Sequence, residues 1–167
     1  FFFHAFSALR DAQESRGLGD VYKRQLPHRC QWIRDLSGVS FYNDSKGTNV
    51  GATMAAIEGL GQSINGHIVL IAGGVAKEAD FTPLAPLISK WAKEIVLIGK
   101  DAEEMASNFY QDIPTNFAKD MDDAVGIASE KASPGDVVLL SPACASFDLF
   151  DDYEDRGRQF KASVRKL

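Results

Sequence analysis

Residues 43–49 bring a carboxylate, an ammonium, two hydroxyls and two side-chain amides together within one short segment. The segment follows a strand-like alternation of apolar and polar residues and precedes helically spaced apolar residues that begin at Val50. Thr48 or Asn49 is expected to cap this helix, because a side-chain oxygen there can accept from the free amides of the first turn. A helix N-terminus also favours anions. Taken alone, the segment is typical of an ordinary capped connection, and only its neighbours can give it a further role.

Two further polar segments, residues 73–80 and 141–146, follow apolar runs that are typical of buried strands. Lys77 comes after two glycines and could hold a carboxylate or phosphate, although a solvated surface lysine is the commoner case. Ser146 is expected to begin the last helix, where its hydroxyl and the following amides would form either an anion site or a plain N-cap. Arg29 could bind a phosphate with its planar guanidinium or form a surface ion pair.

The chain carries none of the usual phosphate-binding sequences of nucleotide enzymes. Its only Gly-Lys pair, Gly99-Lys100, is followed by Asp101 and does not form a Walker A sequence. Neither GxGxxG nor a nucleophile elbow occurs. A nucleotide bound here would therefore take most of its phosphate contacts from elsewhere.

Apolar periodicity and turn residues predict alternating strands and helices from Leu26 onward. An antiparallel hairpin is expected at residues 30–35 and 39–43, with later strands at 67–72, 94–98, 115–118 and 137–140. Helices are expected from Val50, after caps at Thr82 and Asp101, after Asp120 through about Ala132, and at 147–167, the last with Leu167 on its inner side. The alternation predicts an α/β fold, a three-layer, mostly parallel, Rossmann-like sheet with helices on both faces, entered by the hairpin.

This topology places the polar segments at one edge of the sheet. In open α/β sheets ligands bind outside the carboxyl ends of the strands, and residues 44–49, 73–80 and 141–146 all follow such ends. We therefore expect the three loops to face one crevice.

Composition limits the class of protein. With 167 residues, 45% of them hydrophobic, the chain suits one domain with a sizeable core. Its net charge of −5, without a dense basic cluster, argues against nucleic acid as a partner. Two cysteines fit a reducing cytosol, and no apolar run reaches the ~20 residues of a membrane span, so a cytoplasmic location is expected. Residues 1–25 show no regular pattern and form an unassigned head, either the stub of a preceding domain or an artefact of the sequence.

Four separated motifs resemble one enzyme family. They are residues 26–29, residues 43–49, Gly73-Gly74 with Lys77 and 79–81, and 140–146 with Phe150 and Arg156-Gly157. Together they resemble the C-terminal domain of the Mur ligases, and among these the UDP-N-acetylmuramoyl-L-alanine:D-glutamate ligases of peptidoglycan synthesis. The resemblance covers residues 26–167 in order. Residues 44–48 read Asp-Ser-Lys-Gly-Thr, where the other Mur ligases and the folylpolyglutamate synthases carry an Asp-Tyr/Gly-Ala-His type of sequence.

The resemblance implies a role for each loop. The implied D-glutamate pocket consists of Thr48, Lys77, Ser146, Phe147 and Tyr153. The implied nucleotide-binding positions are Arg29, Asp44, His28 and Asn43. Lys77 and Lys46 are the implied catalytic residues, with Lys46 facing the phosphates or the growing product.

This chain departs from the family pattern at three of its positions. Val75 stands where many members have Asp in the loop before the lysine. Phe147 and Tyr153 replace the commoner Leu and Phe, which keeps the walls of the implied pocket apolar.

The implied reaction is the ATP-dependent addition of D-glutamate to UDP-N-acetylmuramoyl-L-alanine through an acyl phosphate, with Mg²⁺ as a further cofactor of the complete enzyme. The phosphate loop, the magnesium ligands and the uridine-binding domain lie outside the matching residues, so no metal site is expected in this chain. We expect a monomer that needs the N-terminal and central domains of the same enzyme and is inactive alone. Two alternatives stay open: the terminal domain of another Mur or folylpolyglutamate-type amide ligase, and a stand-alone α/β module that binds an anionic metabolite or a partner protein.

Overall fold

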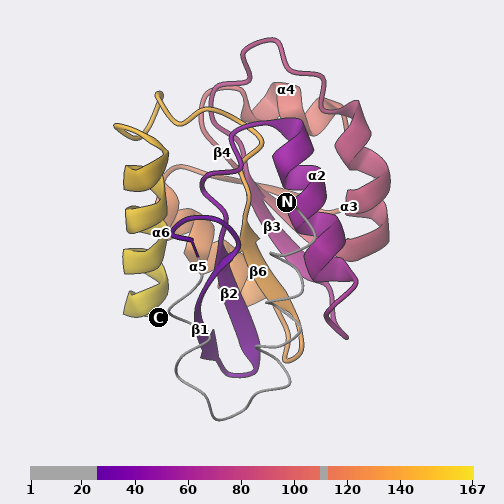
Figure 1. Ribbon diagram of the computed structural model, residues 1–167, viewed down its shortest axis with the longest axis vertical. Helices are drawn as coiled ribbons and strands as arrows, with labels where there is room; N and C mark the ends of the chain where they lie inside the picture. Colours follow the sequence, from indigo (N-terminus) through magenta and orange to yellow (C-terminus); the bar gives the residue numbers. More distant parts are fainter. Residues whose placement is uncertain (1–25, 110–112) are drawn as a thin grey trace.

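The structure, a computed structural model, describes residues 26–109 and 113–167 (Figure 1). The predicted head, residues 1–25, lies outside the described part of the chain. The elements follow one another as β1 (Gln31–Leu36), β2 (Val39–Asn43), α2 (Val50–Gly61), β3 (Ile68–Ala72), η2 (Thr82–Leu84), α3 (Ala85–Trp91), β4 (Ala92–Ile98), α4 (Ala102–Ser107), β5 (Thr115–Ala118), α5 (Met121–Lys131), β6 (Val137–Leu140) and α6 (Tyr153–Lys166).

The strands form one six-stranded mixed sheet in the order β1-β2-β6-β3-β4-β5. β1 and β2 pair antiparallel, and all other neighbouring strands pair parallel. The predicted α/β class, the mostly parallel sheet and the entering hairpin are therefore confirmed. The sequence does not predict the place of β6, which lies in the centre of the sheet. Its Val138 pairs with Phe41 of β2 on one side and with Val69 of β3 on the other.

Helices cover both faces of the sheet, each face over its own apolar core. On one face α2, α3 and α4 contribute Ile57, Ile88 and Met105. On the other face α5 and α6 contribute Val125 and Phe160. Figure 1 shows α2 and α3 on one side of the strands and α6 on the opposite side. Because both faces are covered, β3 and β6 are buried along their whole length, which explains their continuous apolar sequence.

The last helix begins later than the sequence predicts. Instead of running over 147–167, α6 starts at Tyr153, because the carboxylate of Asp152 caps it by accepting from a first-turn amide at 2.6 Å. Residues 147–152 form turns and bends. Leu167, which was predicted to face inward, is exposed at the end of the helix.

Two other predicted caps take different roles. Thr82 opens the short 3-10 helix η2 rather than capping a helix, and the Asp80 carboxylate accepts from its backbone amide at 2.9 Å. Asp101 precedes α4 but makes no side-chain cap there. Its Oδ2 instead accepts from Ala76 N at 2.8 Å, in the loop after β3. The carboxylate of Asp101, which was predicted to cap α4, therefore supports the loop after β3 instead.

Candidate functional site

The loops that leave β2, β6 and β3 meet at one edge of the sheet, as predicted (Figure 1). The β6 loop lies between the other two, and Ala143 N donates to Gly47 O at 2.9 Å. On its other side, Val75 and Ala145 exchange two backbone hydrogen bonds in an isolated antiparallel bridge. The three loops are thus joined through their backbones at the carboxyl ends of the strands, where open α/β sheets bind ligands.

A hollow of about 580 Å³ opens at the start of α2. It is lined by Arg29, Lys46, Thr48, Asn49, Gly51, Ala52 and Tyr153. The Lys46 Nζ atom lies 5.6 Å from the centroid of the Tyr153 ring, a distance typical of a cation–π contact. Asn49 rather than Thr48 caps α2, since its side chain accepts from Ala52 N at 2.9 Å. Two cations, an aromatic ring and a helix N-terminus suit an anionic ligand that also carries apolar or planar atoms.

Lys77 and Phe147 form a second group on the neighbouring loops. The Lys77 Nζ atom lies 5.3 Å from the centroid of the Phe147 ring, and Phe147 is 67% exposed. Neither residue lines the hollow. The structure therefore divides the implied D-glutamate pocket, with Thr48 and Tyr153 on the hollow and Lys77 and Phe147 on the loops after β3 and β6.

Ser146 does not begin a helix, so the predicted helix start at this residue is wrong. Ser146 is 2% exposed, and its carbonyl accepts from Phe150 N at 3.0 Å within the turns before α6. The first amides of α6 lie beyond these turns, where the carboxylate of Asp152 binds one of them. Ser146 nevertheless stays next to Phe147 in the second group.

Asp44 joins loops inside the fold. It is 5% exposed, its Oδ1 accepts from Cys30 N at 3.1 Å, and its Oδ2 accepts from Ser141 Oγ at 2.7 Å. Burial raises the pKa of this carboxyl to about 6, against the opposing effect of the Ser141 hydrogen bond. Gly47 leaves room for it, because a Cβ at that position would come within 2.6 Å of Asp44 Oδ2. Both carboxylate oxygens are therefore used within the protein.

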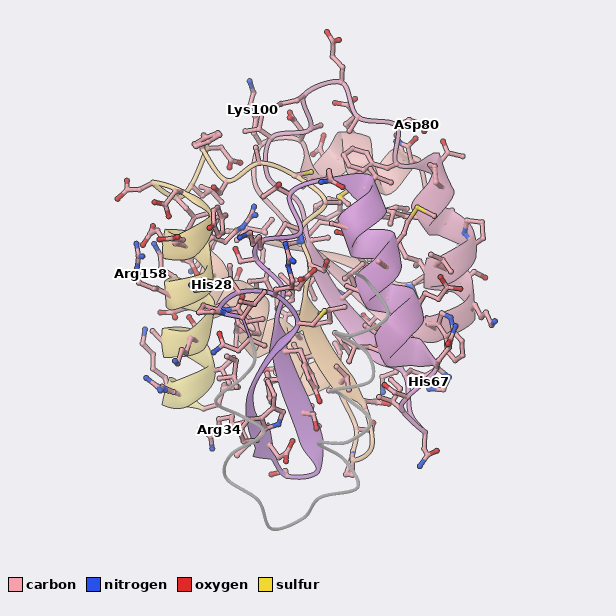
Figure 2. All side chains as sticks on the ribbon, in the orientation of Figure 1. His28, Arg34, His67, Asp80, Lys100 and Arg158 are labelled. Atoms are coloured by element: carbon pink, nitrogen blue, oxygen red, sulfur yellow. The ribbon has the colours of Figure 1, made fainter. Side chains whose placement is uncertain are left out.

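Asn43 and His28 form a second internal network. Asn43 is fully buried; its Nδ2 donates to the Gly157 carbonyl at 3.0 Å, and its Oδ1 accepts from Ser45 N at 3.1 Å. These bonds fix the amide orientation, so Nδ2 also donates to His28 Nδ1 at 3.1 Å and the imidazole carries its proton on Nε2. Burial lowers the pKa of His28, which favours this neutral form. Gly157 is required here because a Cβ would collide with the imidazole, which lies beside α6 (Figure 2).

Arg156 is a central residue that the site prediction missed. It is 1% exposed; Nε donates to Ser45 Oγ at 2.9 Å, Nη2 to Ser45 O at 2.8 Å, and Nη1 to Cys144 O at 3.0 Å. Ser45 Oγ in turn donates to Tyr153 O at 2.7 Å. Burial lowers the pKa of the guanidinium to about 10, so it remains charged at neutral pH. One side chain thus links the loops after β2 and β6 to the start of α6.

The sequence does contain a signal for Arg156. It precedes the buried Phe160 by four positions and Val164 by eight, so it lies on the inner stripe of α6. A charged residue on a buried stripe predicts an internal hydrogen-bond network, because a buried charge without partners is costly.

The first part of the loop that carries Lys77 is held by a backbone bridge and by a carboxylate from the start of α4. Val75 contributes its backbone, through the bridge to Ala145. Asp101 supplies the carboxylate, accepting from Ala76 N. The backbone on the N-terminal side of Lys77 is therefore fixed from two sides.

Within residues 26–109 and 113–167, no three His, Cys, Asp or Glu side chains lie together so that they could hold a metal ion. None of the helices in these ranges is both long and apolar enough to cross a membrane.

The sequence matches the family described as "Mur ligase, glutamate ligase domain" over residues 28–144. It is 54% identical over 142 residues to the UDP-N-acetylmuramoylalanine–D-glutamate ligase of Hahella chejuensis, 55% to that of Legionella pneumophila and 49% to that of Coxiella burnetii. These matches cover 85% of this chain and 32% of each relative. The chain thus spans about a third of the length of the curated relatives it matches.

Solved structures share the fold at low sequence identity. The MurF ligase of Thermotoga maritima in complex with ADP superposes with a TM-score of 0.59 at 17% identity, over 96% of this chain and 37% of that one. The folylpolyglutamate synthase of Mycobacterium tuberculosis complexed with ADP gives a TM-score of 0.61 at 12% identity, over 91% and 35% of the two chains. These likenesses concern the fold alone.

Proposed function

The chain belongs to the family of Mur ligase glutamate ligase domains, and we propose that it is the C-terminal, amino-acid-binding domain of an ATP-dependent D-glutamate ligase. The complete enzyme adds D-glutamate to UDP-N-acetylmuramoyl-L-alanine in peptidoglycan synthesis. Identities of 49–55% to ligases of that name support this substrate choice over those of the other Mur ligases.

One observation carries the proposal within the structure. Lys46 and Lys77 leave different loops at the same sheet edge, and the ammonium of each lies over an aromatic ring, Tyr153 and Phe147 respectively. D-glutamate carries two carboxylates on a short aliphatic chain, so cations flanked by apolar walls match its chemistry. The proposed pocket comprises Thr48, Lys77, Ser146, Phe147 and Tyr153.

The proposed reaction has two steps. The γ-phosphoryl group of ATP passes to the carboxylate of the muramoyl-alanine, which yields ADP and an acyl phosphate. The amine of D-glutamate then attacks the acyl carbon, and the tetrahedral intermediate expels phosphate and loses a proton to give the amide. Lys77 orients D-glutamate and Lys46 stabilises negative charge on the phosphates or the growing product, so both act by positioning and electrostatics.

The nucleotide-binding positions divide into two kinds in this proposal. Arg29 lines the hollow and can reach a phosphate directly with its guanidinium. Asp44, Asn43 and His28 are engaged within the fold, so we propose that they act by holding the loop that carries Lys46.

The rest of the ligase belongs to the proposal as well. ATP and Mg²⁺ are held mainly by the central domain of the same enzyme, over which this domain closes. We place the enzyme in the cytoplasm, where the nucleotide-linked substrate is made, and expect a monomer.

A chimera tests the proposed function. The C-terminal third of the Hahella chejuensis ligase is replaced by residues 26–167, and phosphate release is measured with ATP, Mg²⁺ and UDP-N-acetylmuramoyl-L-alanine. D-glutamate is expected to support release, whereas L-alanine, a diamino acid and a dipeptide are not. A preference for one of the other amino acids indicates another amide ligase, and a folded chimera without any activity favours a stand-alone module.

The 167-residue chain alone is expected to release no phosphate above background in the same assay. Its described residues hold no phosphate loop and no metal-binding cluster. Measurable turnover by the purified chain contradicts this expectation.

A further inference from the structure

Phe147 is a large apolar side chain that remains in solvent. It is 67% exposed, whereas Phe41 of β2 and Phe160 of α6 are fully buried. The ammonium of Lys77 lies over the ring, 5.3 Å from its centroid. The ring therefore contributes little to the core and is available for a role at the surface.

The backbone brings Lys77 and Phe147 together. Val75 and Ala145 exchange hydrogen bonds, and each member of the pair follows its bridge residue by two positions. Lys77 and Glu78 both have positive φ values, 47° and 60°, so the chain turns sharply directly after the bridge. The Cα atoms are thereby fixed, but the long Lys77 side chain keeps its own rotamer freedom unless something restrains its ammonium.

We propose that Phe147 is a positioning residue whose ring holds the Lys77 ammonium where a carboxylate of the incoming amino acid binds. This inference rests on the proposed function and adds a positioning contact that a leucine at the same position cannot supply. A ring face attracts a cation through its quadrupole, whereas an aliphatic side chain offers only contact area.

An aromatic partner also leaves the lysine ammonium available to a carboxylate ligand. Among the residues that the structure describes, no carboxylate lies within 4 Å of Lys77 Nζ in an ion pair. A carboxylate partner would compete with the substrate for the ammonium, but a ring leaves the charge available for a carboxylate ligand. Lys46 over Tyr153 repeats this arrangement on the loop after β2, which provides an internal comparison.

Nuclear magnetic resonance on the isotope-labelled 167-residue chain tests the contact without ligand. The side-chain methylene signals of Lys77 are expected upfield because of the Phe147 ring current. Phe147→Leu is expected to return them to ordinary positions, and Phe147→Trp is expected to retain the shift. The Lys46 signals over Tyr153 serve as the unchanged control, and thermal unfolding checks that each variant is folded. Lys77 signals that do not respond to Phe147→Leu overturn the proposal.

A titration of the same proteins with D-glutamate tests the consequence. An exposed cation–π contact corresponds to about a two- to fivefold change in an equilibrium constant, so Phe147→Leu is expected to raise Kd by about that factor, with recovery in Phe147→Trp. Equal affinity of the wild type and Phe147→Leu overturns the positioning role while leaving the proposed function intact. A wild-type chain with the ring-current shift but no response to D-glutamate supports the contact and counts against the proposed amino-acid site.

Discussion

Replacing Arg156 by methionine removes the side chain that links two site loops to α6. Three donors are lost, two to Ser45 and one to the Cys144 carbonyl, while much of the buried volume is kept. The Ser45 hydroxyl retains its own hydrogen bond to Tyr153 O. The change therefore leaves two buried carbonyl oxygens, those of Ser45 and Cys144, without the donors that the guanidinium supplied.

The expected loss in the free energy of unfolding follows from these two carbonyl oxygens. A buried acceptor left without its donor costs about 1–3 kcal/mol, which gives about 2–6 kcal/mol for the pair. The pKa of Arg156 is lowered to about 10 because burial disfavours its charge, and removing that charge offsets part of the loss. We expect the free energy of unfolding to fall by about 2–4 kcal/mol. With a urea m value of about 2 kcal/mol/M, the midpoint falls by about 1–2 M.

Urea unfolding of the chain, followed by circular dichroism, measures this change. Arg158→Met is the matched control, since Arg158 lies on the same helix and points away from the sheet (Figure 2). Its side chain is 60% exposed and forms ion pairs with Asp155 at 3.6 Å and Glu154 at 4.0 Å. Arg158→Met is expected to change the free energy of unfolding by no more than about 0.5 kcal/mol. If Arg156→Met unfolds at the same urea concentration as Arg158→Met, the linking role assigned to Arg156 is refuted.

Two further substitutions test the loop after β2. The raised pKa of Asp44, about 6 against 3.8, means that the folded protein binds this proton more tightly than the unfolded chain. The free energy of unfolding of the wild type should therefore rise relative to that of Asp44→Asn as the pH falls from about 6 to about 4, by up to about 3 kcal/mol. Paired urea titrations measure both free energies, and a difference between them that stays constant from pH 7 to pH 4 rules this out. Gly47→Ala should lower the free energy of unfolding by about 1–3 kcal/mol, because the new Cβ would press on the Asp44 carboxylate. In α5, by contrast, Gly126→Ala meets no atom within 4 Å and should gain up to about 1 kcal/mol, so similar melting shifts for the two variants argue against the packing explanation.

The sheet and the meeting of its loops could be predicted from local sequence. β3 and β6 are continuous apolar runs because helices cover both of their faces, and their alternation with helices predicts parallel pairing. The common edge of the three loops then follows from the direction of parallel strands. No knowledge of individual contacts is needed for either conclusion.

Burial of single polar residues could not be predicted in this way. Asp44 and Lys46 are two positions apart in one polar stretch, yet the first is buried and the second lines the hollow. The difference arises from Ser141, which is distant in the sequence and supplies the hydrogen bond to the Asp44 carboxylate. Local pattern contains no information about such a partner.

The late start of α6 has a similar cause. Residues 147–152 contain neither glycine nor proline, so nothing in their composition interrupts a helical prediction. A long-range contact keeps these residues out of the helix. The Asp148 carboxylate accepts from Lys100 N at 2.7 Å and holds this segment near the end of β4. Asp152 can then begin the helix with its own side chain.

The central place of β6 has a consequence for synthesis on the ribosome. β2 and β3 emerge long before β6, although β6 is the strand that lies between them. Until residues 137–140 leave the exit tunnel, the β1–β2 hairpin and the β3–β4–β5 sheet each keep an open edge that another strand could pair with. Pairing of β2 with β6 is also slow, because the long segment between them must close first. This domain is therefore expected to fold only when nearly all of it has been made, and its nascent form is the state most in need of a chaperone.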